Sequence, residues 1–224
     1  MKIKFSIWSL LILIAAIPAL SQNTLQVVTT LSTYADIARQ IGGDRVEVKS
    51  IVAGNQDAHF IQPKPSYAVW LADADLFIET GLDLELWVPA LMDKSGNSQI
   101  RSGQKGYVSA AANIRLLEVP VSADRSQGDV HIYGNPHITT SPLNIAVIAD
   151  NIAAGLSNVD PGGKTFYQDR VNTYKDSLFE RLFGKKLLQI LGADILVDLT
   201  QSGNLISFLE EQSFQEEPLI NYLD

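Results

Sequence analysis

The feature that most constrains the fold is an alternation of short β-branched runs with longer segments of helical periodicity. The strands are predicted at residues 25–30, 45–52, 76–78 and 107–110. The helices between them are predicted at residues 32–41, 65–74 and 84–92. Ser32 or Thr33 is expected to cap the first helix. Such alternation is typical of parallel strands joined by right-handed helical crossovers. We therefore expect an α/β fold, with a parallel β-sheet lobe flanked by helices.

The second half of the chain is predicted to be mainly helical. A helix is expected from Pro142, and the sequence Asp160-Pro161-Gly162-Gly163 should end it. A long linking helix is predicted within residues 161–191, followed by a helical tail over residues 192–224. The expected buried stripe of the long helix consists of Phe166, Val171, Tyr174, Leu178 and Leu182.

Residues 1–21 have the pattern of a secretory signal peptide. Lys2 and Lys4 precede an apolar run over residues 5–17, and small residues follow Pro18. The run is shorter than the ~20 residues of a spanning helix, so an uncleaved anchor is the less favoured alternative. We expect a periplasmic protein that does not insert into the membrane after cleavage. The chain has no cysteine, which excludes disulfides, thiolate metal sites and a lipid-modified N-terminal cysteine.

Charge and motifs exclude several functional classes. The chain carries 17 basic and 25 acidic residues, a net charge of −8, which argues against a nucleic acid or an anionic membrane as partner. The sequence contains no glycine-rich nucleotide-binding motif and no serine-hydrolase elbow. Imidazole chemistry would depend on three histidines, His59, His131 and His137.

The histidines occupy proline- and glycine-bearing segments that we expect to be loops. His59 lies in DAHFIQPKPS, where prolines stiffen the backbone, and His131 and His137 lie six residues apart in GDVHIYGNPH. His59 plus one of the other two could bind a metal ion, or all three could be polar surface residues. Asp57 and Asp129 each precede a histidine by two residues, and could orient an imidazole or be simple loop carboxylates.

Several segments, taken in order, resemble the solute-binding proteins of zinc- and manganese-uptake ABC transporters. The resemblance runs from about residue 25 to about residue 182. The segments that carry it are VVTTLSTYADIARQIGGDRVEV, DAHFIQPKPS, ADADLFIETGLDLELW, GDVHIYGNPHI and VIADNIAAGLSNVDPGGKTFYQDR.

The resemblance implies that His59 and His137 are metal ligands and that His131 orients a ligand or is structural. Ala58 departs from the family's usual proline, and residues 139–141 lack the aromatic and aspartate that often precede Pro142. It further implies that residues 22–160 form an amino-terminal metal-binding lobe. Residues 192–224 would be a tail or insertion before a missing C-terminal lobe. That lobe would supply the remaining ligands.

The resemblance also implies a function without catalysis. We expect a periplasmic receptor that delivers a divalent metal to a membrane ABC permease. Zn²⁺ is favoured over Mn²⁺ because both implied ligands are nitrogen atoms, although the region 118–130 lacks a histidine-rich stretch. One alternative is an adhesin-like interaction module on the same fold. Another is a metal-dependent hydrolase in which Asp57, Asp129 or Glu79 assists the histidines.

Overall fold

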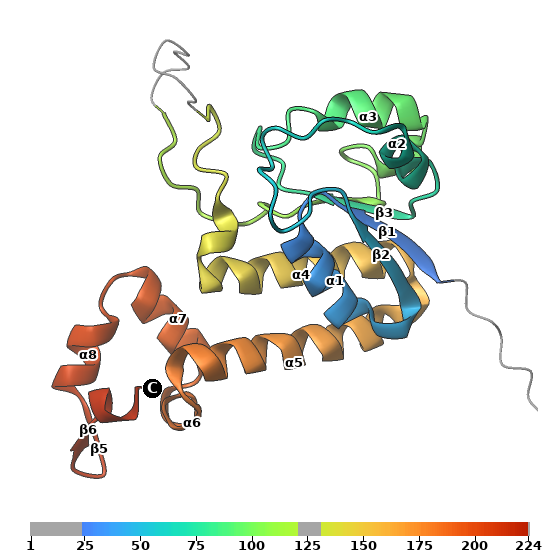
Figure 1. Ribbon diagram of the computed structural model, residues 1–224. Coiled ribbons are helices and arrows are strands. Elements are labelled where there is room, and N and C mark those ends of the chain that lie inside the picture. The colour runs from blue at the N-terminus through green and yellow to red at the C-terminus, as the bar shows by residue number, and fades with distance from the viewer. Residues whose placement is uncertain (1–23, 121–130, 224) are drawn as a thin grey trace, which may run out of the picture.

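Four parallel strands form the central sheet of the computed structural model, which describes residues 24–120 and 131–223. The strands lie in the order β2-β1-β3-β4 (Figure 1). Their bounds are Leu25–Thr29 for β1, Val46–Ser50 for β2, Leu76–Glu79 for β3 and Tyr107–Ser109 for β4. This arrangement confirms the predicted α/β class. The predicted signal peptide and Asp129 lie outside the described residues.

Helices cover both faces of the sheet, because neighbouring residues of a strand point to opposite sides. Val27 packs with α1 (Ser32–Gly42), α4 (Pro142–Val159) and α5 (Lys164–Phe183). Val28 packs on the other face, with α2 (Pro65–Ala72) and α3 (Val88–Ser95). Figure 1 shows α2 and α3 on one side of the sheet and α1 and α4 on the other. Both faces are therefore dry, as expected of a parallel sheet.

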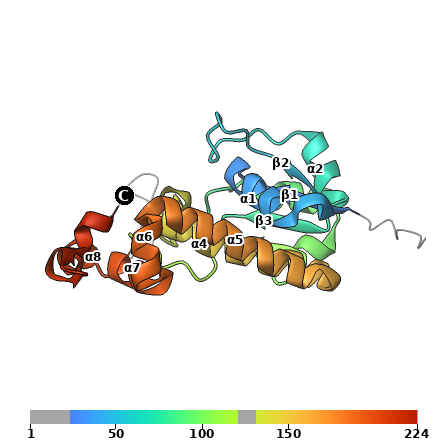
Figure 2. The same cartoon turned by 90° about the horizontal axis from the view of Figure 1, so that it is seen from below.

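The C-terminal segment builds a separate small core at the end of α5. It contains α6 (Lys185–Leu191), α7 (Ala193–Gln201) and α8 (Leu205–Glu211). A short hairpin of β5 (Ser213–Phe214) and β6 (Glu217–Pro218) follows. The buried residues of this core are Ala146, Phe179, Phe183, Leu187, Leu196, Leu209 and Leu219. Figure 2 shows this segment beyond the end of α5 that points away from the sheet.

Short 3₁₀ turns connect the main elements. They are η1 (Gly43–Arg45), η2 (Ser98–Ile100), η4 (Ile138–Thr140), η5 (Pro161–Gly163) and η6 (Leu219–Tyr222). Among the residues that the structure describes, no helix combines the length and the apolar character needed to cross a membrane.

Three local predictions were wrong. The linking helix does not continue to residue 191, because α5 ends at Phe183 and Gly184 takes φ = 81°. The helix expected over residues 84–92 begins only at Val88. Neither Ser32 nor Thr33 caps α1; its N-cap is Leu31, which makes no side-chain cap hydrogen bond. The division of the chain into a lobe of residues 22–160, a linker and a C-terminal tail stays a prediction.

Candidate metal site

The three histidines lie on two loops at the carboxyl end of the sheet. His59 belongs to the connection between β2 and α2, whereas His131 and His137 belong to the segment between β4 and α4. In parallel sheets the connections that follow the strands meet at this edge, where ligand sites are commonly found. Segments far apart in the sequence are thereby brought together.

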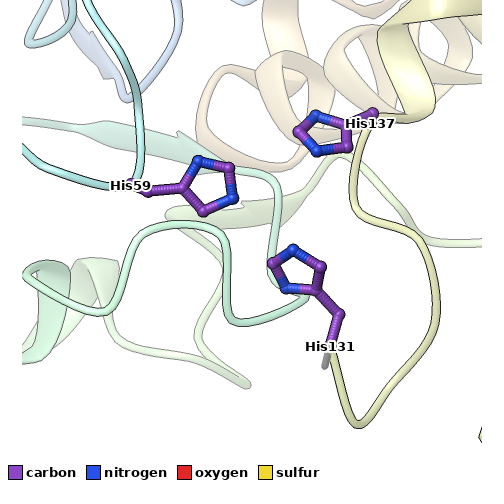
Figure 3. Close-up of side chains that lie close together, drawn as sticks. All are labelled: His59, His131 and His137. Atoms are coloured by element: carbon purple, nitrogen blue, oxygen red, sulfur yellow. The ribbon is translucent and has the colours of Figure 1, made fainter. Parts of the chain in front are cut away.

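The imidazole rings form a compact triangle (Figure 3). Ring centroids are 5.4 Å apart for His59 and His131, 5.5 Å for His59 and His137, and 6.1 Å for His131 and His137. One nitrogen from each ring lies within 4.8 Å of the others. His59 and His131 are half-buried and His137 is exposed, so an ion could reach the group from solvent.

Asp57 orients the ring of His59. Its Oδ1 atom lies 2.8 Å from His59 Nδ1 and accepts a second hydrogen bond, of 2.9 Å, from the His59 backbone N–H. Both hydrogen bonds lower the pKa of Asp57, and the bond from the His59 backbone has the larger effect. A neutral imidazole that donates through Nδ1 presents its Nε2 lone pair to a metal ion. The loop carboxylate thus has the position of an orienting group.

The loop that carries His59 is fixed to the body of the lobe. Trp87 Nε1 donates a 2.8 Å hydrogen bond to the carbonyl oxygen of Ala58. Ile61, on the other side of His59, is buried in the core beneath α2 and α3. His59 therefore lies between two anchored residues, while Phe60 between them points out and is 78% exposed.

The segment from His131 to His137 is also held by its backbone. Gly134 N–H donates to the carbonyl of His131, and Asn135 N–H donates to the carbonyl of Leu117. The Asn135 side chain accepts a 3.0 Å bond from the His137 backbone N–H. These contacts fold the six-residue spacing into a turn, which brings both imidazoles to the same side.

A buried polar cluster lies near the ends of β1 and β3. Glu85, only 5% exposed, accepts hydrogen bonds from Thr30 Oγ1 and from both the backbone and the hydroxyl of Thr80. This cluster fixes the turn that leads to Trp87. Burial, the largest effect, raises the pKa of neighbouring Glu79 to about 7, although Tyr107 donates a hydrogen bond to it.

The geometry bears on each residue named from the sequence. His59 and His137 come together as the resemblance implies, and His131 joins them instead of pointing away. Among the described residues, the histidine group includes no carboxylate, and Glu79 bonds to Tyr107 instead. The ligand assignments themselves stay predictions. Sequence reasoning did not identify Glu85 or Trp87, because their partners Thr30 and Ala58 lie far away along the chain.

Comparison with known proteins finds similarity to substrate-binding proteins of metal-uptake transporters. Residues 27–181 match the family described as "Zinc-uptake complex component A periplasmic" (ZnuA). A manganese ABC transporter substrate-binding lipoprotein, PsaA of Streptococcus mitis, is 31% identical over 160 residues, which are 71% of this chain and 50% of that protein. ScbA of Streptococcus cristatus, a metal ABC transporter substrate-binding lipoprotein, is 29% identical over 70% of this chain and 48% of that protein.

Two solved structures of metal-binding or metal-dependent proteins have the same fold. A zinc-bound deletion mutant of ZnuA is 28% identical with a TM-score of 0.60, over 75% of this chain and 59% of that one. The metal-dependent lipoprotein YcdH of Bacillus subtilis is 26% identical with a TM-score of 0.56, over 70% and 53%. The chain spans about half the length of the curated relatives that it matches.

Proposed function

The chain belongs to the zinc-uptake complex component A periplasmic (ZnuA) family, and on that premise we propose that it captures a divalent transition metal for a membrane ABC permease. Its cargo would be bound by His59 and His137 and handed to the permease without chemical change. The named relatives are substrate-binding proteins of metal transporters rather than enzymes. The predicted signal peptide supports action in the periplasm.

The observation that carries this proposal is the convergence of imidazoles from two loops. The rings of His59 and His137 are 5.5 Å apart, and Asp57 holds His59 in an orientation suited to metal binding. Both histidines are reachable from solvent, as a receptor that loads and unloads an ion requires. A purely structural pair of histidines would not need this exposure.

We propose zinc as the preferred cargo over manganese. Imidazole nitrogen suits Zn²⁺, whereas Mn²⁺ is better matched by carboxylate, carbonyl and water oxygens. The histidine group, taken over the described residues, contains nitrogen donors alone. The relatives include both metals, manganese in the name of PsaA and bound zinc in the ZnuA structure. The donor atoms of this chain are therefore the argument for zinc.

The other two functions considered from the sequence receive no support from the relatives. PsaA and ScbA are both named as substrate-binding lipoproteins of ABC transporters. A hydrolase would also need a general base beside the metal. Glu79 is hydrogen-bonded to Tyr107 within the sheet and lies outside the histidine group.

The proposal is tested by titrating the purified chain with Zn²⁺ and with Mn²⁺ in a calorimeter. His59→Ala and His137→Ala should each lower the zinc affinity about 100-fold, because each removes one nitrogen ligand. Lys105→Ala, an exposed change in the turn before β4, is the control and should bind as the parent does. Zinc binding that survives both histidine changes would exclude this site as the place of capture.

A further inference from the structure

We infer that His131 is a third metal ligand, so that this lobe holds a three-nitrogen site of its own. The inference rests on the proposed function, because it concerns the same ion. It departs from the role that the family resemblance implies for His131, which is orienting or structural. It also means that two neighbouring loops of one lobe supply three of the ligands.

The distances support a shared ion. Ligand nitrogens of the three histidines lie within 4.8 Å of one another. Zinc–nitrogen bonds of 2.0–2.1 Å at tetrahedral angles place nitrogens about 3.3 Å apart, so the rings need to close by about 1.5 Å at most. Side-chain rotation is sufficient for that movement. His131 is as near to His59 as His137 is, since their centroid distances are 5.4 Å and 5.5 Å.

The turn that carries His131 is braced so that its ring faces the other two. Gly134 takes φ = 108°, and a Cβ built on it would lie 2.9 Å from the carbonyl oxygen of Leu117. Asn135 bonds to that same carbonyl through its backbone and to Glu118 through its side chain. The turn is therefore tied to residues 117 and 118, and its two histidines are fixed relative to each other.

The donor set defines the chemistry of the site. Three neutral imidazoles leave a tetrahedral ion one open position, which is the arrangement of zinc sites that exchange a ligand. The Asp57 carboxylate, bonded to His59, places a negative charge near the ion without being a ligand in this arrangement. A site of this kind favours zinc over manganese more strongly than a two-histidine site would.

The test compares His131→Ala with Tyr133→Ala, a change in the same turn. Tyr133 is 53% exposed and lies two residues from His131, so its loss perturbs the turn without removing a nitrogen. We expect His131→Ala to weaken zinc binding about 100-fold and Tyr133→Ala to leave it nearly unchanged. Adding free imidazole should restore much of the affinity of the His131→Ala chain, because it fills the vacated position.

X-ray absorption spectroscopy of the zinc-loaded chain counts the imidazole ligands of the ion directly. The parent should show three imidazole ligands and His131→Ala should show two. An unchanged count together with unchanged affinity would overturn the third-ligand assignment, even where His59→Ala and His137→Ala abolish binding. If none of the three changes affects binding, the proposed function itself fails, and the two failures are thereby distinguished.

Stoichiometry tests whether one chain is enough. The inference predicts one zinc ion per chain at concentrations where the protein remains monomeric by analytical ultracentrifugation. One ion per two chains, accompanied by zinc-dependent dimerisation, would show that ligands from two copies complete the site. That outcome would overturn the self-contained site while preserving metal binding by His59 and His137.

Discussion

Trp87 and Ala58 are joined by a 2.8 Å hydrogen bond from the indole N–H to the backbone carbonyl, next to His59. Trp87 is 8% exposed and lies in the core with Ile61, so the bond ties the His59 loop to α3. The loop geometry at the proposed metal site thus depends on a residue that lies outside the histidine group. A ligand whose backbone is fixed loses less conformational freedom when the ion binds.

Replacing Trp87 with phenylalanine should therefore weaken metal binding. The change removes the indole donor and should lower stability by about 1 kcal/mol or more, because the Ala58 carbonyl loses its partner. Zinc affinity should fall roughly tenfold, as is common when a group supporting a ligand is lost. Trp70→Phe, at a partly buried position against the same core, is the control. Equal zinc affinity in both variants would argue against an anchoring role for Trp87.

Asp57→Asn should reduce zinc affinity about 10- to 100-fold, since the carboxylate orients His59 and raises its basicity as a ligand. The folded state should be little affected, because Asp57 is exposed. Competition with a chromophoric zinc chelator measures the affinity. Asp73→Asn, at the exposed end of α2, changes the net charge equally and should have no effect. If both variants lose affinity alike, the cause is general electrostatics instead of the bond to His59.

Glu79→Gln should stabilise the protein at alkaline pH. The folded pKa of Glu79 is about 7, raised mainly by burial from its usual 4.5. Since the folded state holds the proton more tightly, stability falls as pH rises from about 4.5 to about 7, by roughly 3 kcal/mol at most. Urea unfolding should show Glu79→Gln gaining stability over the parent at about pH 8 and little at about pH 4. A pH-independent difference between the two would refute this explanation.

A matched control for that experiment is Glu47→Gln. Glu47 is an exposed residue of β2, and its pKa is lowered, first by a hydrogen bond from Gln26 and then by Lys49. The sign of its pH dependence is therefore opposite to that of Glu79. Glu47→Gln should not gain stability as the pH rises.

The tie between η1 and the corner joining α4 to α5 gives a stability prediction at acidic pH. Arg45 bonds to Asp160 at 2.6 Å, and the Tyr167 hydroxyl donates to the same carboxylate at 2.7 Å. Tyr167 and Arg45 lower the pKa of Asp160 against the opposing effect of burial. This contribution is present above the unfolded pKa and is lost as pH falls through the folded pKa. Asp160→Asn should cost about 1.5–3 kcal/mol near neutrality and less in acid. A constant cost across that pH range would contradict the assignment.

The central fold could be predicted because its signals are local. The β-branched run at residues 25–30 and the helical spacing from Pro142 each determine one element, and the parallel order follows from their alternation. The break in the long helix was missed although Gly184 was visible. The apolar periodicity continues past this glycine into α6, so pattern alone could not separate one helix from two.

The buried face of α5 shows a second limit of pattern reasoning. Of the predicted stripe only Val171 is fully buried, whereas Tyr167, Phe179 and Phe183 were not predicted. The first half of α5 packs against α1 and α4, and its second half packs into the small core with α6 to α8. A single stripe cannot describe a helix that contacts two different cores.

The convergence of the histidines was predictable in part. The motif resemblance named His59 and His137 as a ligand pair, an assignment that stays a prediction, and these two rings do lie close together. A six-residue spacing in a loop does not determine where His131 points. Its position depends on the contacts of Gly134 and Asn135 with Leu117, which are set by tertiary structure. Glu85 and Trp87 lie in a largely apolar segment, and their partners Thr30 and Ala58 can be known only from the fold.

Gly134→Ala should disrupt the histidine turn specifically. A methyl group at this position would meet the Leu117 carbonyl oxygen at 2.9 Å, in a backbone conformation of φ = 108° that side chains disfavour. The turn must then shift, and we expect zinc affinity to fall at least tenfold while the thermal transition of the core changes little. Gly103→Ala is the matched control, because Gly103 has φ = 84° but nothing within 4 Å of a Cβ. Gly103 lies in the turn before β4, away from the histidines, so a loss of affinity confined to Gly134→Ala would assign the effect to the turn that carries His131 and His137.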